Sequence, residues 1–341
     1  MLKSKFNDYS RRCQCSAVTE AFATPHRGRS PTLHLGATVS NHYMISQPNK
    51  QCDHQSSAAA AMKAIHISRF TDNLPDIVPS NTATPTPKGK QTIHIQVTHA
   101  AVTHVDLLYA QGLHQNNKRH VTPPFILGTE FAGIVLSAPP SSTIRPGTRV
   151  FGGGLGAFAE QICVAEDSVR RVPRQWSNAE ACAVGASGAV SYGALHGVAR
   201  LQAGESVCVL GASGGLGVMA VQIAKARGAH VIAVVGSDVK ADVVRRCGAD
   251  EVVLYTEPRW EDAVRDKSPG AHGVDVVYDA IGAVESGIKC LKYRGRLVIV
   301  GFAARGGKME NVRANRILLK SAMVHGYVSL QSSPSRDLFN C

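Results

Sequence analysis

Four glycines in seven residues, Gly211, Gly214, Gly215 and Gly217, follow an apolar run near the middle of the chain. Glycine permits the backbone angles of a tight turn, and without a Cβ the backbone N–H groups can approach a phosphate. The run SVCVLG before them resembles a buried strand and a helix-like segment follows, which is the context of a dinucleotide-binding turn. The alternative is that the glycines only let helix pack on strand. The residues expected to bind a diphosphate are Ala212, Ser213, Gly214, Gly215, Leu216 and Gly217.

The choice between two dinucleotides depends on the end of the next strand, about 20 residues further on. A carboxylate there would bind the ribose 2′-hydroxyl of NAD, but the residue is Val235. Gly236 and Ser237 follow and are small, and Lys240 comes one turn into the next helix. A 2′-phosphate would fit beside the small residues and attract the lysine, so the pattern favours NADPH. For Lys240 taken alone, an ordinary surface lysine is the alternative.

These residues must be positioned by strands and helices that alternate along the second half of the chain. Alternation of this kind predicts a parallel sheet with crossover helices. Helix-like segments include 218–227 and 239–246, and Gly228 and Gly248 stand where helices end. The predicted buried strands lie at 206–211, 230–235, 251–255, 274–282 and 296–302.

The chain divides into four parts. Residues 62–183 carry short alternating apolar runs and turn signals, which predict a small, mostly β domain. Residues 184–328 carry the α/β pattern, and 329–341 form an atypical tail. Residues 1–61 are basic, poor in acids and without periodicity, which predicts a disordered extension or a mitochondrial transit peptide. The alternative is that translation starts at Met62.

Composition narrows the classes of protein. The formal net charge is +12, but the basic residues are scattered and no nucleic-acid-binding signature occurs, so we expect a basic surface and an anionic small ligand. The nine cysteines form no CxxC pair, which favours a reducing compartment. The most apolar window is interrupted by glycines, so no membrane span is expected. We expect a cytoplasmic protein, or a mitochondrial one if the first segment is a transit peptide.

The order and combination of several runs add a resemblance to a known family. Residues 62–328 resemble the zinc-independent branch of the medium-chain dehydrogenase/reductases, and among these the NADPH:quinone oxidoreductases and enoyl reductases. The runs that carry the resemblance are PPFILGTEFAG, GAFAEQICVAEDSV, LQAGESVCVLGASGGLG, GADEVVLY, VDVVYDAIG, GRLVIVGFAARGG and LLKSAMVHG.

The resemblance implies a GroES-like substrate domain joined to a doubly wound Rossmann domain, with the cofactor between them. It places the 2′-phosphate on Gly236, Lys240 and Tyr255, and the nicotinamide near Gly301 and Phe302. It also implies that NADPH gives a hydride to a quinone or an α,β-unsaturated carbonyl compound, while the protein orients the substrate and stabilises the developing oxygen anion. Family members are commonly dimers or tetramers, and the edge formed by SAMVHGYV predicts a homodimer.

No metal is expected. Zinc-dependent relatives bind the metal through Cys and His, because zinc prefers thiolate and imidazole ligands. Here Thr129 occupies the His position, next to the retained Glu130, and Thr103 stands near the first Cys position.

The substrate pocket departs from the family pattern. Thr103 replaces an Asn, Ala110 replaces an Arg, and His114 stands where a Tyr is common. We take Thr103, Asp106 and His114 as the catalytic candidates; a solvated loop histidine is the alternative for His114.

Family members also continue for several tens of residues beyond the VHG run, so we expect the C-terminal part to be truncated, with reduced stability or activity. The second hypothesis for function is therefore a catalytically weak or silent NADPH-binding protein with a structural or RNA-binding role.

Overall fold

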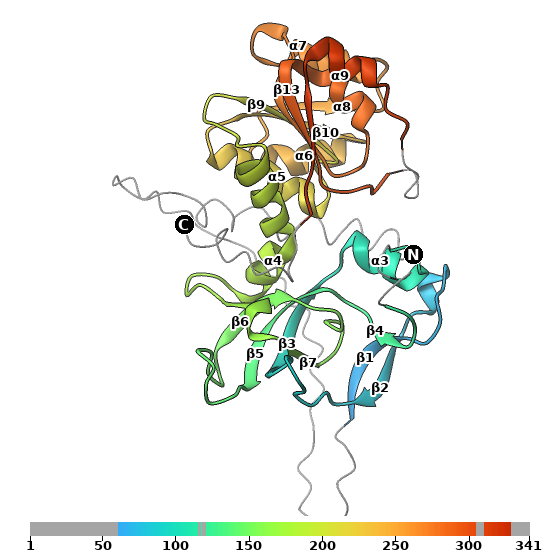
Figure 1. Ribbon diagram of the computed structural model, residues 1–341, viewed down its shortest axis with the longest axis vertical. Coiled ribbons are helices and arrows are strands. Elements are labelled where there is room, and N and C mark those ends of the chain that lie inside the picture. The colour runs from blue at the N-terminus through green and yellow to red at the C-terminus, as the bar shows by residue number, and fades with distance from the viewer. Residues whose placement is uncertain (1–60, 115–116, 118–120, 305–309, 329–341) are drawn as a thin grey trace, which may run out of the picture.

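The computed structural model describes residues 61–114, 117, 121–304 and 310–328, coloured along the chain in Figure 1. Most of the predicted N-terminal extension and the predicted tail lie outside the described residues. The described residues form a β-rich half and a half built on a parallel sheet.

A six-stranded parallel sheet is the centre of the second half. Its strand order is β11-β10-β9-β12-β13-β14, so the order along the sheet reverses direction between β9 and β12. This order is that of the doubly wound dinucleotide-binding fold and confirms the predicted fold class. The strands are β9 (Ser206–Leu210), β10 (His230–Val235), β11 (Glu251–Leu254), β12 (Val274–Asp279), β13 (Leu291–Ile299) and β14 (Met323–Gly326).

Both faces of this sheet are buried. In β9, Val207 and Val209 pack in one core cluster, while Cys208 and Leu210 pack in a second cluster on the opposite face. Alternate side chains of a strand point to opposite faces, so an all-apolar strand needs helices on both sides. The helices are α5 (Gly215–Ala226), α6 (Asp238–Arg246), α7 (Trp260–Asp266), α8 (Val284–Cys290) and α9 (Ala314–Lys320), with the short η5 (Pro269–Ala271).

Two of these helices end as the sequence predicts. Gly228 follows α5 with a φ of 76°, and Gly248 follows α6 with a φ of 100°. These left-handed angles strain any residue with a Cβ, so glycine ends both helices and returns the chain to the next strand.

The β-rich half contains two antiparallel sheets, as expected for residues 62–183. One has the order β2-β1-β4 and the other β7-β3-β5-β6-β8, around a core that includes Ile93, Ile95, Phe131 and Val150. The strands are β1 (Ala61–Ile67), β2 (Pro79–Ala83), β3 (Ile93–Ala101), β4 (Phe125–Ile126), β5 (Glu130–Ser137), β6 (Arg149–Gly153), β7 (Gln161–Val164) and β8 (Val169–Arg171). The helical elements are η1 (Leu74–Asp76), α3 (His104–Gln111) and η3 (Glu166–Ser168).

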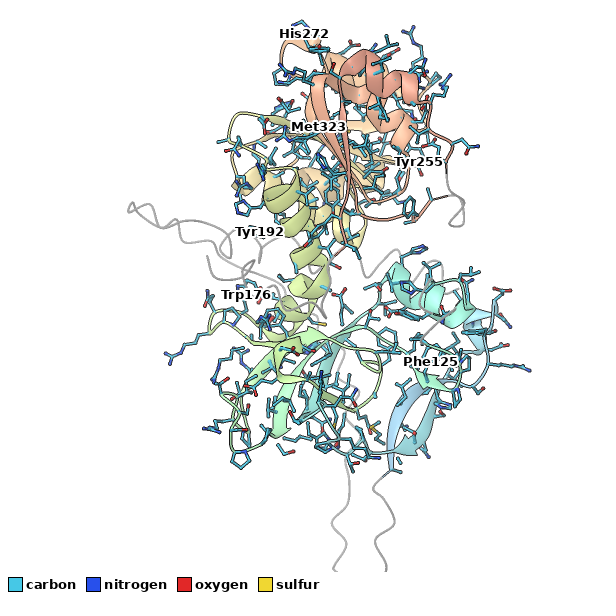
Figure 2. All side chains as sticks on the ribbon, in the orientation of Figure 1. Phe125, Trp176, Tyr192, Tyr255, His272 and Met323 are labelled. Atoms are coloured by element: carbon cyan, nitrogen blue, oxygen red, sulfur yellow. The ribbon has the colours of Figure 1, made fainter. Side chains whose placement is uncertain are left out.

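Helix α4 (Asn178–Tyr192) connects the two halves and continues into a π-helical turn, η4 (Gly193–Val198). In Figure 2, Trp176 lies beside the β-rich half just before α4, and Tyr192 lies further up, toward the parallel sheet. Gly185 breaks the helical angles with φ 9° and ψ −129°. The domain boundary predicted between 183 and 184 therefore falls inside one helix, directly before its kink.

Within the described ranges, helices long and apolar enough to cross a membrane were not found.

Candidate functional site

The glycine turn lies where β9 leads into α5. Gly211 has a φ of 74°, and Gly214 is the N-cap of α5 with extended backbone. Among the residues that the structure describes, no side chain caps this helix. The first N–H groups of a helix have no partner inside it, and they carry its positive end. The first turn of α5 therefore offers backbone donors to an anion, as the sequence predicts.

The glycines of the turn have different neighbours. A Cβ built on Gly217 would lie 2.2 Å from the Gly211 carbonyl oxygen and 2.6 Å from Ala212 Cα, so Gly217 allows the helix to pack closely on the turn. A Cβ on Gly214 would meet only the Gly211 oxygen, at 3.4 Å, and one on Gly215 only Ser187 Oγ, at 3.9 Å. Packing thus explains Gly217 but leaves Gly214 and Gly215 beside space that a diphosphate could fill.

The end of β10 lies beside this turn, because β10 pairs with β9. Val235 is buried, so the position that would hold an NAD-selecting carboxylate carries an apolar side chain packed in the core. A Cβ on Gly236 would lie 2.4 Å from the Tyr255 hydroxyl oxygen, so this glycine lets the half-exposed tyrosine lie over the backbone. Ser237 is the N-cap of α6 and makes no side-chain capping bond.

Lys240 lies in the first turn of α6 and is exposed. Among the residues that the structure describes, no carboxylate forms an ion pair with its ammonium group. Gly236, Ser237 and Lys240 thus adjoin one another at the carboxyl end of β10, and Tyr255 follows β11 and donates its N–H to the Val235 oxygen at 3.0 Å. The group has donors and a positive charge, which suit a phosphate.

Gly301 and Phe302 follow β13. A Cβ on Gly301 would lie 2.9 Å from the Ala280 oxygen, so the backbone passes close to the end of β12. The Phe302 ring covers Gly282, whose φ is 79°, and keeps an exposed face. Since β9, β12 and β13 are parallel neighbours, their following loops meet at one edge of the sheet.

A second polar cluster lies in the β-rich half, where α3 begins. Thr103 is the N-cap of α3 and its hydroxyl donates to Asp106 Oδ2 at 2.9 Å, while its backbone N–H donates to the same oxygen at 2.7 Å. Thr129 Oγ1 donates to Asp106 Oδ1 at 3.0 Å. Burial raises the pKa of Asp106, and the bonds from Thr103 and Thr129 partly oppose this. The cluster of Thr103, Asp106 and Thr129 therefore brings together two of the three catalytic candidates.

Glu130 extends this cluster toward α4, and the sequence analysis did not select it. It is 5% exposed, and burial together with the Asp106 charge raises its pKa to about 7, while the Ala186 and Ser187 backbone N–H groups and the Ser187 hydroxyl partly oppose the shift. Ser187 Oγ donates to Glu130 Oε1 at 3.3 Å. The sequence contains one signal for Glu130: a single acidic residue directly precedes the apolar run FAGIV of a predicted strand.

His114 lies at the other end of α3, beyond the Gly112 C-cap. An eight-residue helix separates it from Thr103, about 12 Å along the axis. Its ring stacks on Tyr109 with centroids 4.3 Å apart, and burial lowers its pKa. The structure therefore does not join His114 to the cluster of Thr103, Asp106 and Thr129 as a single catalytic group.

Two family models match the sequence. The alcohol dehydrogenase GroES-like domain matches residues 89–174, and the zinc-binding dehydrogenase model matches residues 215–339. The quinone oxidoreductase-like protein 2 of Bos taurus is 35% identical over 248 residues, covering 71% of this chain and 69% of that protein. The chain belongs to the medium-chain dehydrogenase/reductases of the quinone oxidoreductase type.

Solved structures agree with this family. A probable oxidoreductase from Mycobacterium abscessus has a TM-score of 0.70 and 36% identity, covering 80% of this chain and 81% of that one. The Escherichia coli quinone oxidoreductase, solved in complex with NADPH, has a TM-score of 0.69 and 27% identity, covering 79% and 81%. Both halves of this chain thus have counterparts in dehydrogenase/reductases.

The name of the second family model raises the question of zinc. Zinc in proteins takes thiolate, imidazole and carboxylate ligands. Thr129, predicted to occupy the His position, and Thr103, predicted to stand near the first Cys position, both donate their hydroxyls to Asp106. In the described residues no three His, Cys, Asp or Glu side chains form a group that could bind a metal ion. The residues at this place do not fit zinc, and no step below depends on it.

Proposed function

We propose that this protein is an NADPH-dependent oxidoreductase that reduces quinones or α,β-unsaturated carbonyl compounds without a metal. One observation carries the proposal: the first turn of α5, which no described side chain caps, lies beside the end of β10, where Val235 occupies the position of an NAD-selecting carboxylate. Lys240 follows in the first turn of α6, which also contains Asp238. A diphosphate would bind the α5 amides, and a 2′-phosphate would bind Ser237, Lys240 and Tyr255. The Escherichia coli relative solved with NADPH supports this choice.

When bound, NADPH would supply the hydride. Gly301 and the exposed face of Phe302 would lie against the nicotinamide, since they follow β13 at the same edge of the sheet. The cluster of Thr103, Asp106 and Thr129 would orient the substrate. His114, whose pKa is lowered by burial so that its neutral form is favoured, would hydrogen-bond the substrate oxygen. Neither role needs a nucleophile.

The test of the cofactor is a paired titration with NADPH and NADH, followed by intrinsic fluorescence. Wild type should bind NADPH at least tenfold more tightly, because a 2′-phosphate gains charge-assisted hydrogen bonds at Lys240. Lys240→Ala should lose most of that preference and leave NADH binding unchanged. Arg246→Ala, which removes the same charge from the other end of α6, is the matched control and should behave as wild type. Equal affinity of wild type for both nucleotides contradicts the proposal.

The test of activity is NADPH consumption with 1,4-naphthoquinone and with an enone. Turnover supports the reductase. Tight NADPH binding without turnover on either compound would favour the second hypothesis, a catalytically silent nucleotide-binding protein.

We further propose a homodimer through the β14 edge of the parallel sheet. β14 pairs with β13 on one side, and the large apolar side chains exposed on β14 and the preceding helix are Leu318, Leu319, Met323 and Val324. A second copy could pair along this strand and cover these side chains.

A further inference from the structure

Helix α4 belongs to both halves of the molecule, and its first part is fixed to the β-rich half. Asn178 Nδ2 donates to Thr98 Oγ1 on β3 at 2.9 Å, and Arg149 on β6 donates to Asn178 Oδ1 at 3.3 Å. Glu180 closes a capping box with Ser177 at the start of the helix. These bonds hold the helix up to its kink.

The second part of α4 is fixed to the parallel-sheet half. The Ser191 hydroxyl is fully buried, donates to the Leu216 oxygen of α5 at 3.0 Å and lies 2.8 Å from the Tyr278 hydroxyl of β12. Leu216 is one of the residues of the glycine turn. A rotation of this part of α4 would therefore move the first turn of α5.

Glu130 lies at the junction of the two parts. Its Oε2 would be 2.8 Å from a Cβ on Gly185, the residue at the kink, and its Oε1 accepts the Ser187 hydroxyl just after the kink. Ser187 Oγ in turn lies 3.9 Å from the place of a Cβ on Gly215. Glu130 on β5 thus contacts α4 at the kink, Ser187 lies near the start of α5, and Ser191 joins α4 to Leu216 of the glycine turn.

We propose that Glu130 is a positioning residue, whose carboxyl group holds the second part of α4 at the Gly185 kink and thereby sets the glycine turn relative to the cluster of Thr103, Asp106 and Thr129. The proposal deepens the proposed function, on which it rests for its nucleotide. Glu130 acts through Ser187 and the α4 backbone.

The surroundings of Glu130 determine how its role at the kink depends on pH. Glu130 faces Asp106 of α3 and Cys182 of α4. Burial and the charge of Glu130 raise the pKa of the Cys182 thiol to about 12. At this level β3 and β6 pair with β5 through Ala101 and Gly153, which carry no charge. Its Oε2 has no hydrogen-bond partner among the described residues. Ionisation therefore places a second negative charge beside Asp106, only partly compensated by the Ala186 and Ser187 donors, and weakens the arrangement at the kink.

The raised pKa of Glu130 determines whether rising pH strengthens or weakens the kink. The closed kink binds a proton on Glu130 up to about pH 7, whereas an opened, hydrated kink releases it nearer pH 4.5, so rising pH favours opening. The phosphates of a nucleotide on α5 add repulsion in the same direction. NADPH should bind wild type about fivefold more weakly at pH 8 than at pH 6, after correction for the nucleotide's own titration.

Three variants test this assignment. Glu130→Gln keeps the size and an acceptor for Ser187 but cannot ionise, and Glu130→Ala removes the contact. Glu180→Ala is the matched control, because it removes a carboxylate that caps the same helix but lies five residues before the kink at Gly185. Glu130→Ala should weaken NADPH binding about tenfold, while Glu180→Ala should lower the melting temperature and leave binding unchanged.

The pH profile separates positioning from simple stability. Glu130→Gln should match wild type at pH 6 and keep that affinity at pH 8, so the two dissociation constants should diverge across pH 7. The nucleotide's 2′-phosphate titrates identically in both proteins and cancels in the comparison. Parallel profiles for wild type and Glu130→Gln would overturn the proposal.

Hydrogen exchange, measured without nucleotide, tests the role of Glu130 independently of whether the protein binds NADPH. Hydrogen exchange should be faster in Glu130→Ala at residues 186–192 and 215–218, and unchanged there in Glu180→Ala. If wild type fails to bind NADPH, the proposed function fails and the exchange result still decides the role of Glu130. Equal exchange at those residues in wild type, Glu130→Gln and Glu130→Ala would overturn it.

Discussion

At the scale of single residues, the glycine turn contains positions with two kinds of constraint. Gly217 has backbone atoms within 2.6 Å of its missing Cβ, whereas Gly215 has only a serine hydroxyl at 3.9 Å. The first position serves the packing of α5 on the turn, and the second borders space at the helix N-terminus. Substitution can therefore separate folding from binding within three residues.

Gly217→Ala should lower the free energy of unfolding by about 3 kcal/mol, because its Cβ meets rigid backbone atoms. Gly215→Ala should leave the melting temperature within a few degrees of wild type but weaken NADPH binding, because its methyl group enters the space proposed for the diphosphate. Chemical denaturation and a nucleotide titration on both variants check this. Strong destabilisation by Gly215→Ala would show that this glycine also serves packing.

At the scale of elements, α4 links the two halves through buried polar contacts as well as through apolar packing. Ser191 and Tyr278 are both fully buried, and burial raises the pKa of the Tyr278 hydroxyl. A buried hydroxyl that loses its partner costs more than the hydrogen bond itself contributed. The interface between α4 and β12 should therefore respond strongly to the loss of one member.

Ser191→Ala should lower the free energy of unfolding by about 1–3 kcal/mol, since Tyr278 loses this partner. The double variant Ser191→Ala/Tyr278→Phe should recover part of that loss, because neither buried hydroxyl remains. Urea denaturation of the four proteins of the cycle measures the coupling. Strict additivity would mean that the two hydroxyls do not stabilise each other.

At the scale of the whole molecule, one edge of the parallel sheet exposes apolar surface. Met323 and Val324 of β14 are exposed, and Leu318 and Leu319 of α9 are more than 70% exposed. Side chains of this kind on an edge strand favour association. The opposite edge strand, β11, ends at Leu254, and Tyr255 follows it beside the proposed nucleotide site.

Sedimentation equilibrium should give a dimer for wild type and a monomer for Val324→Lys, because a charge on the edge strand opposes pairing with a second copy. Val78→Lys places the same charge on an exposed valine of the β-rich half and should leave the dimer intact. An unchanged dimer in Val324→Lys would exclude β14 as the interface.

The fold could be predicted from the sequence because the apolar runs are local and strong. Strands such as 206–210 are buried on both faces, and the glycines at 228 and 248 end helices through their own backbone angles. The glycine turn was recognisable for the same reason, since its strand, turn and helix are contiguous.

The catalytic end of the site was harder to predict because its residues meet only through tertiary structure. Thr103 and Asp106 carried a readable local signal, the spacing of a capping box, and the structure uses them in that way. Glu130 meets Ser187 across 57 residues, at a kink that nothing in an Ala- and Gly-rich helix specifies. Its importance depends on a shape that periodicity does not encode.

The contact between Gly185 and Glu130 has an evolutionary consequence. With Oε2 only 2.8 Å from the site of a Cβ, a methyl group at 185 would force the carboxyl group of Glu130 to move. In a lineage that acquires alanine at 185, a shorter residue at 130 would relieve this contact. Aligned descendants should therefore change at these two positions together, although the positions are 55 residues apart in the chain.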